Sequence, residues 1–171
     1  MIYNLQAVSG AQYEIDTLKR DRQPYIDRDY RFLFVPDELN GLPLVKTCGN
    51  DKLLSEREPC FSFHSDTDVS VYVLFADKFP VVPSWLEQFD RLRLNVTRYD
   101  SNPENLKGYY SVYRRNFPKG IITLNGCSPD ALLKQAWYID SIVNNYCMYA
   151  VCVKEKEDDF TPRGISPEKT I

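Results

Sequence analysis

One seven-residue stretch, between residues 69 and 75, restricts the possible folds more than any other feature. It reads Val-Ser-Val-Tyr-Val-Leu-Phe, with an apolar residue at every odd position. Successive side chains of a β-strand point to opposite faces, so one face of this strand is predicted to lie against a core. The other face carries Tyr72 and Leu74 and is only half polar, which indicates a central strand. The residues predicted to face the core are Val69, Val71, Val73 and Phe75.

Seven further runs show a similar short alternation and are separated by turn residues. Strands at such regular spacing are typical of a β-sandwich or barrel. The aromatic content of 13% is rich in Tyr and Phe, which favour pleated, half-buried surfaces. The chain is therefore predicted to be an all-β, antiparallel β-sandwich of the jelly-roll or immunoglobulin-like type. The seven runs are 13–18, 30–35, 60–63, 92–97, 109–113, 120–124 and 148–153.

The length of 171 residues suits one domain, and a chain of this length can bury a core without disulfides or metal. Residues 1–153 are predicted to form that domain. From residue 154 onward the chain is polar and interrupted by proline. Because such a segment has too little apolar surface to offset the entropy lost on ordering, residues 154–171 are predicted to be a disordered tail.

A helical pattern interrupts the strands between about residues 128 and 145. Its opening triplet, Ser-Pro-Asp at 128–130, is typical of an N-cap followed by the first helical turn. An amphipathic helix is expected over 130–144, with a stripe made of Leu132, Ala136, Ile139 and Val143. Leu133 and Trp137 widen the apolar arc beyond one packing face, so both are candidate interface residues. Simple packing of Trp137 on the sheet is the alternative.

Charge and leader patterns restrict the partners and the location of the chain. The net charge is −3, with the basic residues scattered among acids, so nucleic acid is not expected to bind. No apolar run is long enough to span a membrane, and the first residues lack the pattern of a secretion signal. A soluble, cytoplasmic chain that contacts neither membrane nor nucleic acid is expected.

The titratable and thiol side chains show no spacing typical of an active or metal site. His64 is the only histidine and follows Cys60 by four residues, a separation along a strand that is too long for a hydrogen bond. The five cysteines occur at irregular spacing without a Cys-x-x-Cys pair, which favours reduced thiols over disulfides or a metal centre. No cofactor, no metal and no enzymatic activity are therefore predicted.

Seven segments, taken in their order along the chain, carry a resemblance to a known family. They are 25–32, 35–41, 47–52, 61–63, 69–73, 83–86 and 117–126. With this order, the chain resembles the small β-sandwich module appended to many secreted bacterial carbohydrate-active and cell-surface proteins. The resemblance runs from about residue 10 to 126 and resumes at 149–153. It implies an accessory module without catalytic residues of its own, which in some cases binds glycans.

Two polar clusters within this resemblance are candidate binding residues, with two interpretations open. Carboxylate, amide and ammonium groups around an aromatic ring could hold the hydroxyl groups of a sugar. The same groups could instead form an ion-pair network that fixes a strand to a neighbouring loop. Trp85, on a turn at 84–87, is predicted to plug one end of the sandwich rather than to stack on a sugar. The clusters are Asp27, Arg28 and Tyr30 with Asn50, Asp51 and Lys52.

Two functional hypotheses follow. The first is a non-enzymatic intracellular adaptor or structural subunit that binds protein partners through the helix at 128–145 and the tail at 154–171. A cytoskeletal or ciliary assembly is one conceivable setting for it. The alternative is a carbohydrate-binding accessory module that takes a glycan, as the resemblance implies.

Overall fold

Ten antiparallel strands in two sheets form the framework of the computed structural model, which describes residues 1–100, 102–104 and 106–156. The smaller sheet has the order β1-β5-β9 and the larger one β2-β4-β10-β6-β8-β7-β3. The two sheets form a sandwich, so the predicted all-β antiparallel fold is confirmed. The strands are β1 (Ile2–Ala7), β2 (Glu14–Thr17), β3 (Arg31–Phe34), β4 (Pro43–Lys46), β5 (Pro59–Ser65), β6 (Val69–Ala76), β7 (Asp90–Tyr99), β8 (Leu106–Phe117), β9 (Gly120–Asn125) and β10 (Ala150–Glu155).

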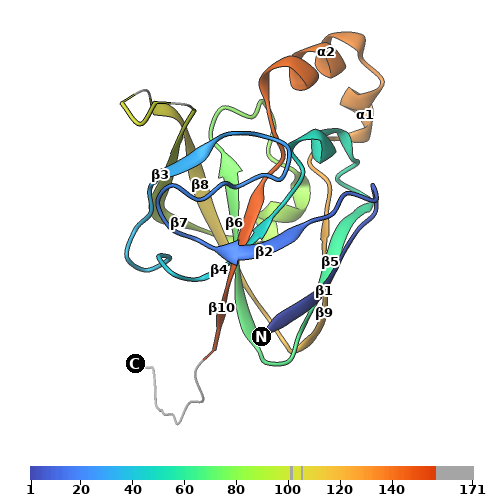
Figure 1. Ribbon diagram of the computed structural model, residues 1–171. Helices are drawn as coiled ribbons and strands as arrows, with labels where there is room; N and C mark the ends of the chain where they lie inside the picture. Colours follow the sequence, from blue (N-terminus) through green and yellow to red (C-terminus); the bar gives the residue numbers. More distant parts are fainter. Residues whose placement is uncertain (101, 105, 157–171) are drawn as a thin grey trace.

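Strand β6 is central, as its sequence predicts. It pairs with β10 on one side and β8 on the other, and Figure 1 shows it between β3, β7 and β8 on one side and β1, β5 and β9 on the other. The four residues predicted to face a core are all buried, and Tyr72 and Leu74 on the other face are buried too. A strand buried on both faces needs two cores, and the structure has two.

The first core lies between the sheets and is called the inter-sheet core. The second lies on the other face of β6 and is called the curled-sheet core. Both consist of side chains that are almost completely removed from solvent. The inter-sheet core includes Phe61, Phe63, Val71, Phe75, Ile122 and Leu124. The curled-sheet core includes Phe32, Leu44, Tyr72, Leu74, Tyr110 and Val112.

The curled-sheet core exists because the two edges of the larger sheet meet. The segment that follows β2 reaches β3, the opposite edge strand. Asp21 N donates to Phe32 O at 2.8 Å, and Phe32 N donates to Arg22 O at 2.9 Å. These bonds satisfy backbone groups that an open edge would leave unpaired, and they make the sheet curl around its own apolar face.

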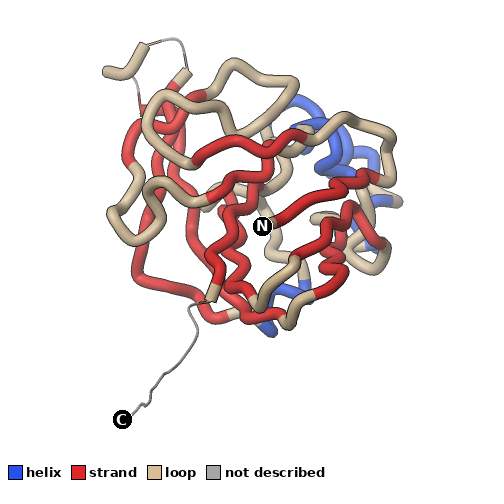
Figure 2. The backbone as a smooth tube through the Cα atoms, turned by 60° about the horizontal axis from the view of Figure 1, so that its bottom comes forward, coloured by secondary structure: helices blue, strands red, loops and turns tan. Residues whose placement is uncertain are grey.

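Most helical segments, blue in Figure 2, gather on one side of the molecule.

The sequence patterns did not indicate β1 or β4. Strand β1 lies at the edge of the smaller sheet, and its register against β5 shifts between Tyr3 and Gln6. Asn4 has a φ of 58°, which interrupts the regular alternation. Strand β4 has four residues and pairs with β2 and β10. It is a strand because both neighbours offer it hydrogen bonds, and no local pattern shows that.

The predicted helical insertion is confirmed, but it is divided into two helices and its buried face differs from the predicted stripe. The helices are α1 (Asp130–Leu133) and α2 (Ala136–Asn145). The break before α2 changes which side chains face inward, so the buried residues are Tyr138 and Ile142, whereas Ala136 and Val143 of the predicted stripe are exposed.

Ser128 is also not a helix cap. The N-cap of α1 is Pro129, which has no side-chain capping bond. The buried Ser128 hydroxyl instead donates to Lys52 O at 2.8 Å and lies 2.9 Å from the Tyr138 hydroxyl. It therefore fixes the helical insertion to the sandwich. Lys154 and Glu155, predicted to belong to the tail, are instead the last residues of β10, because they pair with Ser70 and Val69 of β6. Residues 157–171 of the predicted tail lie outside the described residues.

Candidate functional site

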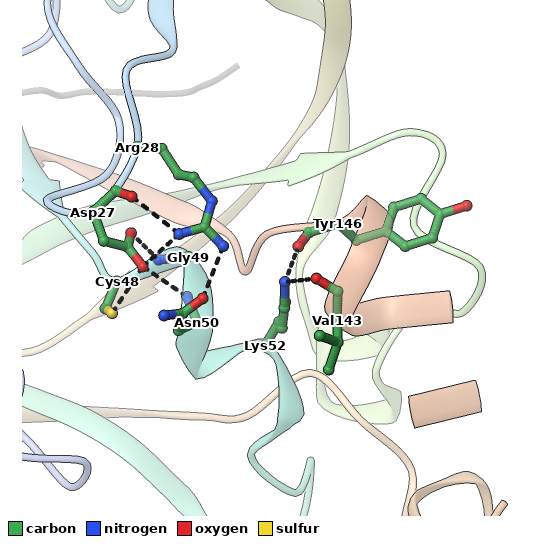
Figure 3. A network of polar contacts seen from close by, with 8 residues as sticks. All are labelled: Asp27, Arg28, Cys48, Gly49, Asn50, Lys52, Val143 and Tyr146. Atoms are coloured by element: carbon green, nitrogen blue, oxygen red, sulfur yellow. Dashed lines mark hydrogen bonds and ion pairs between the residues drawn. The ribbon is translucent and has the colours of Figure 1, made fainter. Parts of the chain in front are cut away.

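The predicted polar clusters separate into groups with different partners. Asp27 accepts a bond from Gly49 N at 2.7 Å through Oδ1, and from Asn50 N at 3.1 Å through Oδ2. Arg28 joins the two segments, with Nη1 2.7 Å from Asp27 Oδ2 and Nη2 2.8 Å from Asn50 Oδ1 (Figure 3). Asp27 thus holds the first amides of the 3-10 helix η1 (Gly49–Leu53). These contacts are those of a network that fixes one loop to another.

The ionisation of Asp27 follows from these contacts. Partial burial opposes the carboxylate, but the amide of Gly49, the thiol of Cys48 and the amide of Asn50 outweigh burial and lower the pKa of Asp27. The same environment raises the pKa of the Cys48 thiol to about 11, because burial and the neighbouring carboxylate disfavour a thiolate. Asp27 therefore stays ionised, and Cys48 stays a neutral thiol.

Lys52 and Asp51 have hydrogen-bond partners outside this network. Lys52 is buried, and its Nζ donates to Val143 O at 2.9 Å and Tyr146 O at 2.7 Å at the end of α2 (Figure 3). An ammonium in this position satisfies carbonyls that have no partner within the helix. Asp51 accepts bonds from Ser9 and the Tyr13 hydroxyl. The six predicted residues therefore do not share one surface, and sugar binding by Asp27, Arg28 and Asn50 stays a prediction.

Tyr30, the last of the six predicted binding residues, contacts a group of side chains around Arg98 that the sequence did not indicate. Its ring lies over the guanidinium of Arg98, with the centroid 4.3 Å from Cζ. Arg98 is 9% exposed, and its Nη1 donates to Tyr110 Oη at 2.9 Å and Tyr25 Oη at 3.3 Å. One signal could have found it: Arg98 is two residues beyond Val96, a core residue, and so shares its face of β7.

The helical insertion leaves one large aromatic side chain in solvent. Trp137 is 62% exposed, and its ring meets the buried ring of Tyr138 edge-on, with 6.0 Å between centroids. Its predicted exposure is confirmed. Leu133 is half-buried against the inter-sheet core. Whether these two residues contact a partner stays a prediction.

Trp85 plugs the sandwich as predicted. It lies on the 3-10 helix η2 (Ser84–Gln88), packs against the inter-sheet core, and its Nε1 donates to Gly126 O at 2.8 Å. Ser84 does not cap this helix, since Pro83 is at the N-cap. Cys60 is buried, while the half-exposed His64 packs against Tyr3 in a tilted arrangement with 5.3 Å between ring centroids.

Two open hollows flank a bulge in β7. Leu92 lies opposite Val112 and Asn95 opposite Ser111 on β8, so Arg93 and Leu94 are extra residues pushed out of the ladder. The first hollow has a volume of about 450 Å³ and the second about 470 Å³. Arg93, Leu94 and Asn95 line both, which makes the two hollows neighbours. The first is lined further by Phe34, Pro36, Asp37 and Glu38, and the second by Arg91 and Leu92.

The first hollow combines an aromatic ring with charged and amide groups. Phe34 is 55% exposed, although its backbone is fixed to β7 by a bond from Phe34 N to Thr97 Oγ1 at 3.1 Å. Asp37, Glu38 and Arg93 supply acceptors and donors beside the ring. No sequence pattern marks this site, because the bulge that creates it depends on the register between β7 and β8.

Solved structures with a similar fold include glycoside hydrolases. A β-glucuronidase from glycoside hydrolase family 2 superposes with a TM-score of 0.66 and 21% identity, over 90% of this chain and 14% of that chain. A GH138 enzyme targeting pectin rhamnogalacturonan II superposes with a TM-score of 0.49 and 12% identity, over 93% of this chain and 17% of that chain. No family model matches the sequence, and no curated protein matches it. At this level of identity the first similarity establishes a shared fold.

Within the described ranges, no helix is long and apolar enough to cross a bilayer. The same residues contain no cluster of three or more His, Cys, Asp or Glu side chains arranged to hold a metal ion. All five cysteines are free thiols. Burial raises the pKa of Cys60 to about 12, so this thiol is not a nucleophile at neutral pH.

Proposed function

We propose that this chain is a non-catalytic accessory domain that binds a carbohydrate in the hollows beside the β7 bulge. The observation that carries the proposal is the first hollow, where a half-exposed aromatic ring stands among carboxylate, guanidinium and amide groups. Sugars present both apolar C–H faces and hydroxyl groups. A site for them therefore needs an aromatic surface with polar groups around its rim.

Each residue of the first hollow makes a different kind of contact with the sugar. Phe34 offers its ring to the C–H face of a pyranose. Asp37 and Glu38 accept bonds from sugar hydroxyls, while Arg93 and Asn95 donate to them. Because the second hollow continues past Arg93 and Asn95, a chain of more than one sugar unit fits the pair of hollows better than a monosaccharide.

The comparison of folds supports an accessory role. The matched part is 14% of the β-glucuronidase from glycoside hydrolase family 2, so this fold occurs there as a small part of a much longer enzyme. This agrees with a domain that assists a catalytic unit rather than acting as one. The adaptor hypothesis, with its cytoplasmic and its cytoskeletal or ciliary settings, gains no support from the described residues beyond the exposure of Trp137.

A binding experiment tests the proposal. The chain is screened against an array of neutral and acidic oligosaccharides, and the best ligand is titrated by calorimetry. Phe34→Ala is expected to weaken binding by about tenfold or more, about 1.4 kcal/mol, without loss of stability, because the ring is exposed. Tyr3→Ala is the matched control, since Tyr3 is a similarly exposed aromatic on the smaller sheet. Absence of binding to any glycan, or equal losses in both variants, would refute the proposal.

A further inference from the structure

The two hollows beside the β7 bulge differ in charge. The second hollow, of about 470 Å³, is lined by Arg91 and Arg93, and none of its other lining residues is charged. The first hollow shares Arg93 but is also lined by Asp37 and Glu38. Since the chain carries a net charge of −3, the second hollow is opposite in sign to the chain as a whole. A ligand that spans both hollows meets positive groups at one end and negative groups at the other.

Both arginines are open to solvent on the same side of β7. Exposure alternates along this segment: Arg91, Arg93 and Asn95 are exposed, whereas Leu92 and Leu94 are partly buried against the curled-sheet core. The leucines therefore fix the strand from below, and the two guanidinium groups lie on its open side. A ligand can reach them without displacing any other part of the protein.

Neither guanidinium group is neutralised by a carboxylate. The ion pairs of the described residues include neither Arg91 nor Arg93. Arg91 Nη2 donates to Ser111 Oγ at 2.9 Å, and that hydroxyl donates to Asp77. The Asp77 carboxylate thus positions Arg91 through Ser111 without pairing with it. Two like charges that line one hollow repel each other, and an anion between them removes that repulsion.

We propose that the second hollow takes an acidic unit of the glycan, a uronate whose carboxylate lies between Arg91 and Arg93. The inference rests on the proposed function and specifies the class of its ligand. Guanidinium groups bind a carboxylate through paired N–H donors. Asp37 and Glu38 disfavour a second carboxylate in the first hollow, so the unit that lies on Phe34 is neutral.

Pairs of sugars that differ by one carboxylate test this inference on the whole chain. Glucose is compared with glucuronate, galactose with galacturonate, and cellobiose with cellobiouronic acid, each titrated by calorimetry at low salt. Exposed ion pairs are individually weak, but two guanidinium groups on one carboxylate should favour the acid by about tenfold. Equal affinities within every pair, or no binding of any acid, overturn the inference. The proposed function survives either result if neutral glycans still bind.

A double variant locates the acidic subsite. Arg91→Gln with Arg93→Gln removes both charges but keeps an N–H donor at each position. It should bind cellobiouronic acid about tenfold more weakly and cellobiose almost as the wild type does. The matched control is Arg57→Gln with Arg115→Gln, which removes two exposed arginines that line neither hollow and should keep the preference for the acid.

The two double variants change the net charge equally, so they separate a local site from general attraction. Equal losses of acid binding in both would show that overall surface charge draws the acid, and would overturn the inference. Unchanged acid binding by the variant of Arg91 and Arg93 would do the same. Phe34→Ala tests the proposed function separately, because it should weaken binding of cellobiose and of cellobiouronic acid by the same factor.

Discussion

The two faces of the larger sheet bury side chains of different kinds. The inter-sheet core is rich in Phe and Val, and its buried hydroxyl groups bond to neutral partners, as in the bond from Tyr149 Oη to Asn125 O at 2.6 Å. The curled-sheet core ends in a charged group, where the hydroxyls of Tyr25 and Tyr110 meet the guanidinium of Arg98.

The two cores therefore contribute to the fold in different ways. The inter-sheet core is covered by a sheet on each side and by α2, so burial of apolar area is its main contribution. The curled-sheet core also encloses polar groups. Buried polar groups cost free energy unless they are paired. Among the described residues, Arg98 Nε is a buried polar atom without a hydrogen-bond partner.

The largest effect is expected in the inter-sheet core. Phe63 is fully buried and stacks near Phe61, with 6.2 Å between centroids. Phe63→Ala should lower the free energy of unfolding by about 3–5 kcal/mol, because it leaves a cavity in an apolar core. Urea denaturation measures this loss. The exposed Ile121 on the neighbouring strand β9 is the control, since Ile121→Ala should change stability by less than about 0.5 kcal/mol. Similar losses in both variants would contradict the assignment of this core.

The next effect compares one hydroxyl from each core. Tyr110→Phe removes the acceptor of a charged donor, Arg98 Nη1, and should cost about 1–3 kcal/mol of stability. Tyr149→Phe removes a neutral bond from the inter-sheet core and should cost about 0.5–1.5 kcal/mol. Parallel denaturant titrations compare the two. If Tyr149→Phe were the more harmful change, the curled-sheet core would not be the one that depends on polar contacts.

A pH-dependent effect is expected at the loop network. The pKa of Asp27 is lowered in the folded chain, so its carboxylate adds stability above its unfolded pKa of about 3.9, and that stability is lost as the pH falls through the folded pKa. Asp27→Asn should be less stable than wild type by about 1–2 kcal/mol near neutral pH. The difference should shrink in acid.

Denaturant titrations across that pH range measure this difference. Asp37→Asn provides the control, because the Asp37 side chain is exposed at the β7 hollow. Its effect on stability should be small at every pH. A constant deficit of Asp27→Asn down to the most acidic pH would show that the lost contacts do not depend on ionisation.

The smallest effect on stability is expected beside the inter-sheet core. Trp137 is exposed next to Tyr138, which is buried in that core. Trp137→Ala should change stability by less than about 0.5 kcal/mol, measured by thermal unfolding. If Trp137 is a docking residue, the same variant should bind a partner more weakly by about 2 kcal/mol. A loss of several kcal/mol in stability would show that Trp137 supports the fold after all.

Strand positions were predictable wherever alternation was long. Between residues 69 and 75 every other side chain is apolar, and this period alone placed four residues in a core. Strands β1 and β4 were missed because a distorted edge strand and a four-residue strand carry little periodicity. The helix prediction failed at Lys134 and Gln135, where the chain leaves the helical conformation. The buried Tyr138 and Ile142 then replaced the predicted stripe.

The candidate sites were less predictable than the fold. Asp27, Arg28 and Asn50 contact one another, as their grouping in the sequence analysis implied. The ammonium group of Lys52 instead contacts the end of α2, and the carboxylate of Asp51 contacts Tyr13. The β7 hollows had no signal in the sequence, because the bulge at Arg93 and Leu94 is defined only against β8. Gly126 is a further case: a Cβ there would overlap the Leu54 carbonyl, and no local pattern indicates that close approach.

By itself the sequence determined the all-β class, the central place of β6 and the exposure of Trp137. Each of these follows from the order of apolar and polar residues within a short segment. Only the tertiary structure decided that the larger sheet curls onto itself, that Arg98 is enclosed by three tyrosines, and that Gly108 lies opposite Arg98. Those features depend on which distant segments become neighbours. Register and closure are set by contacts across the whole chain, and periodicity within one strand does not encode them.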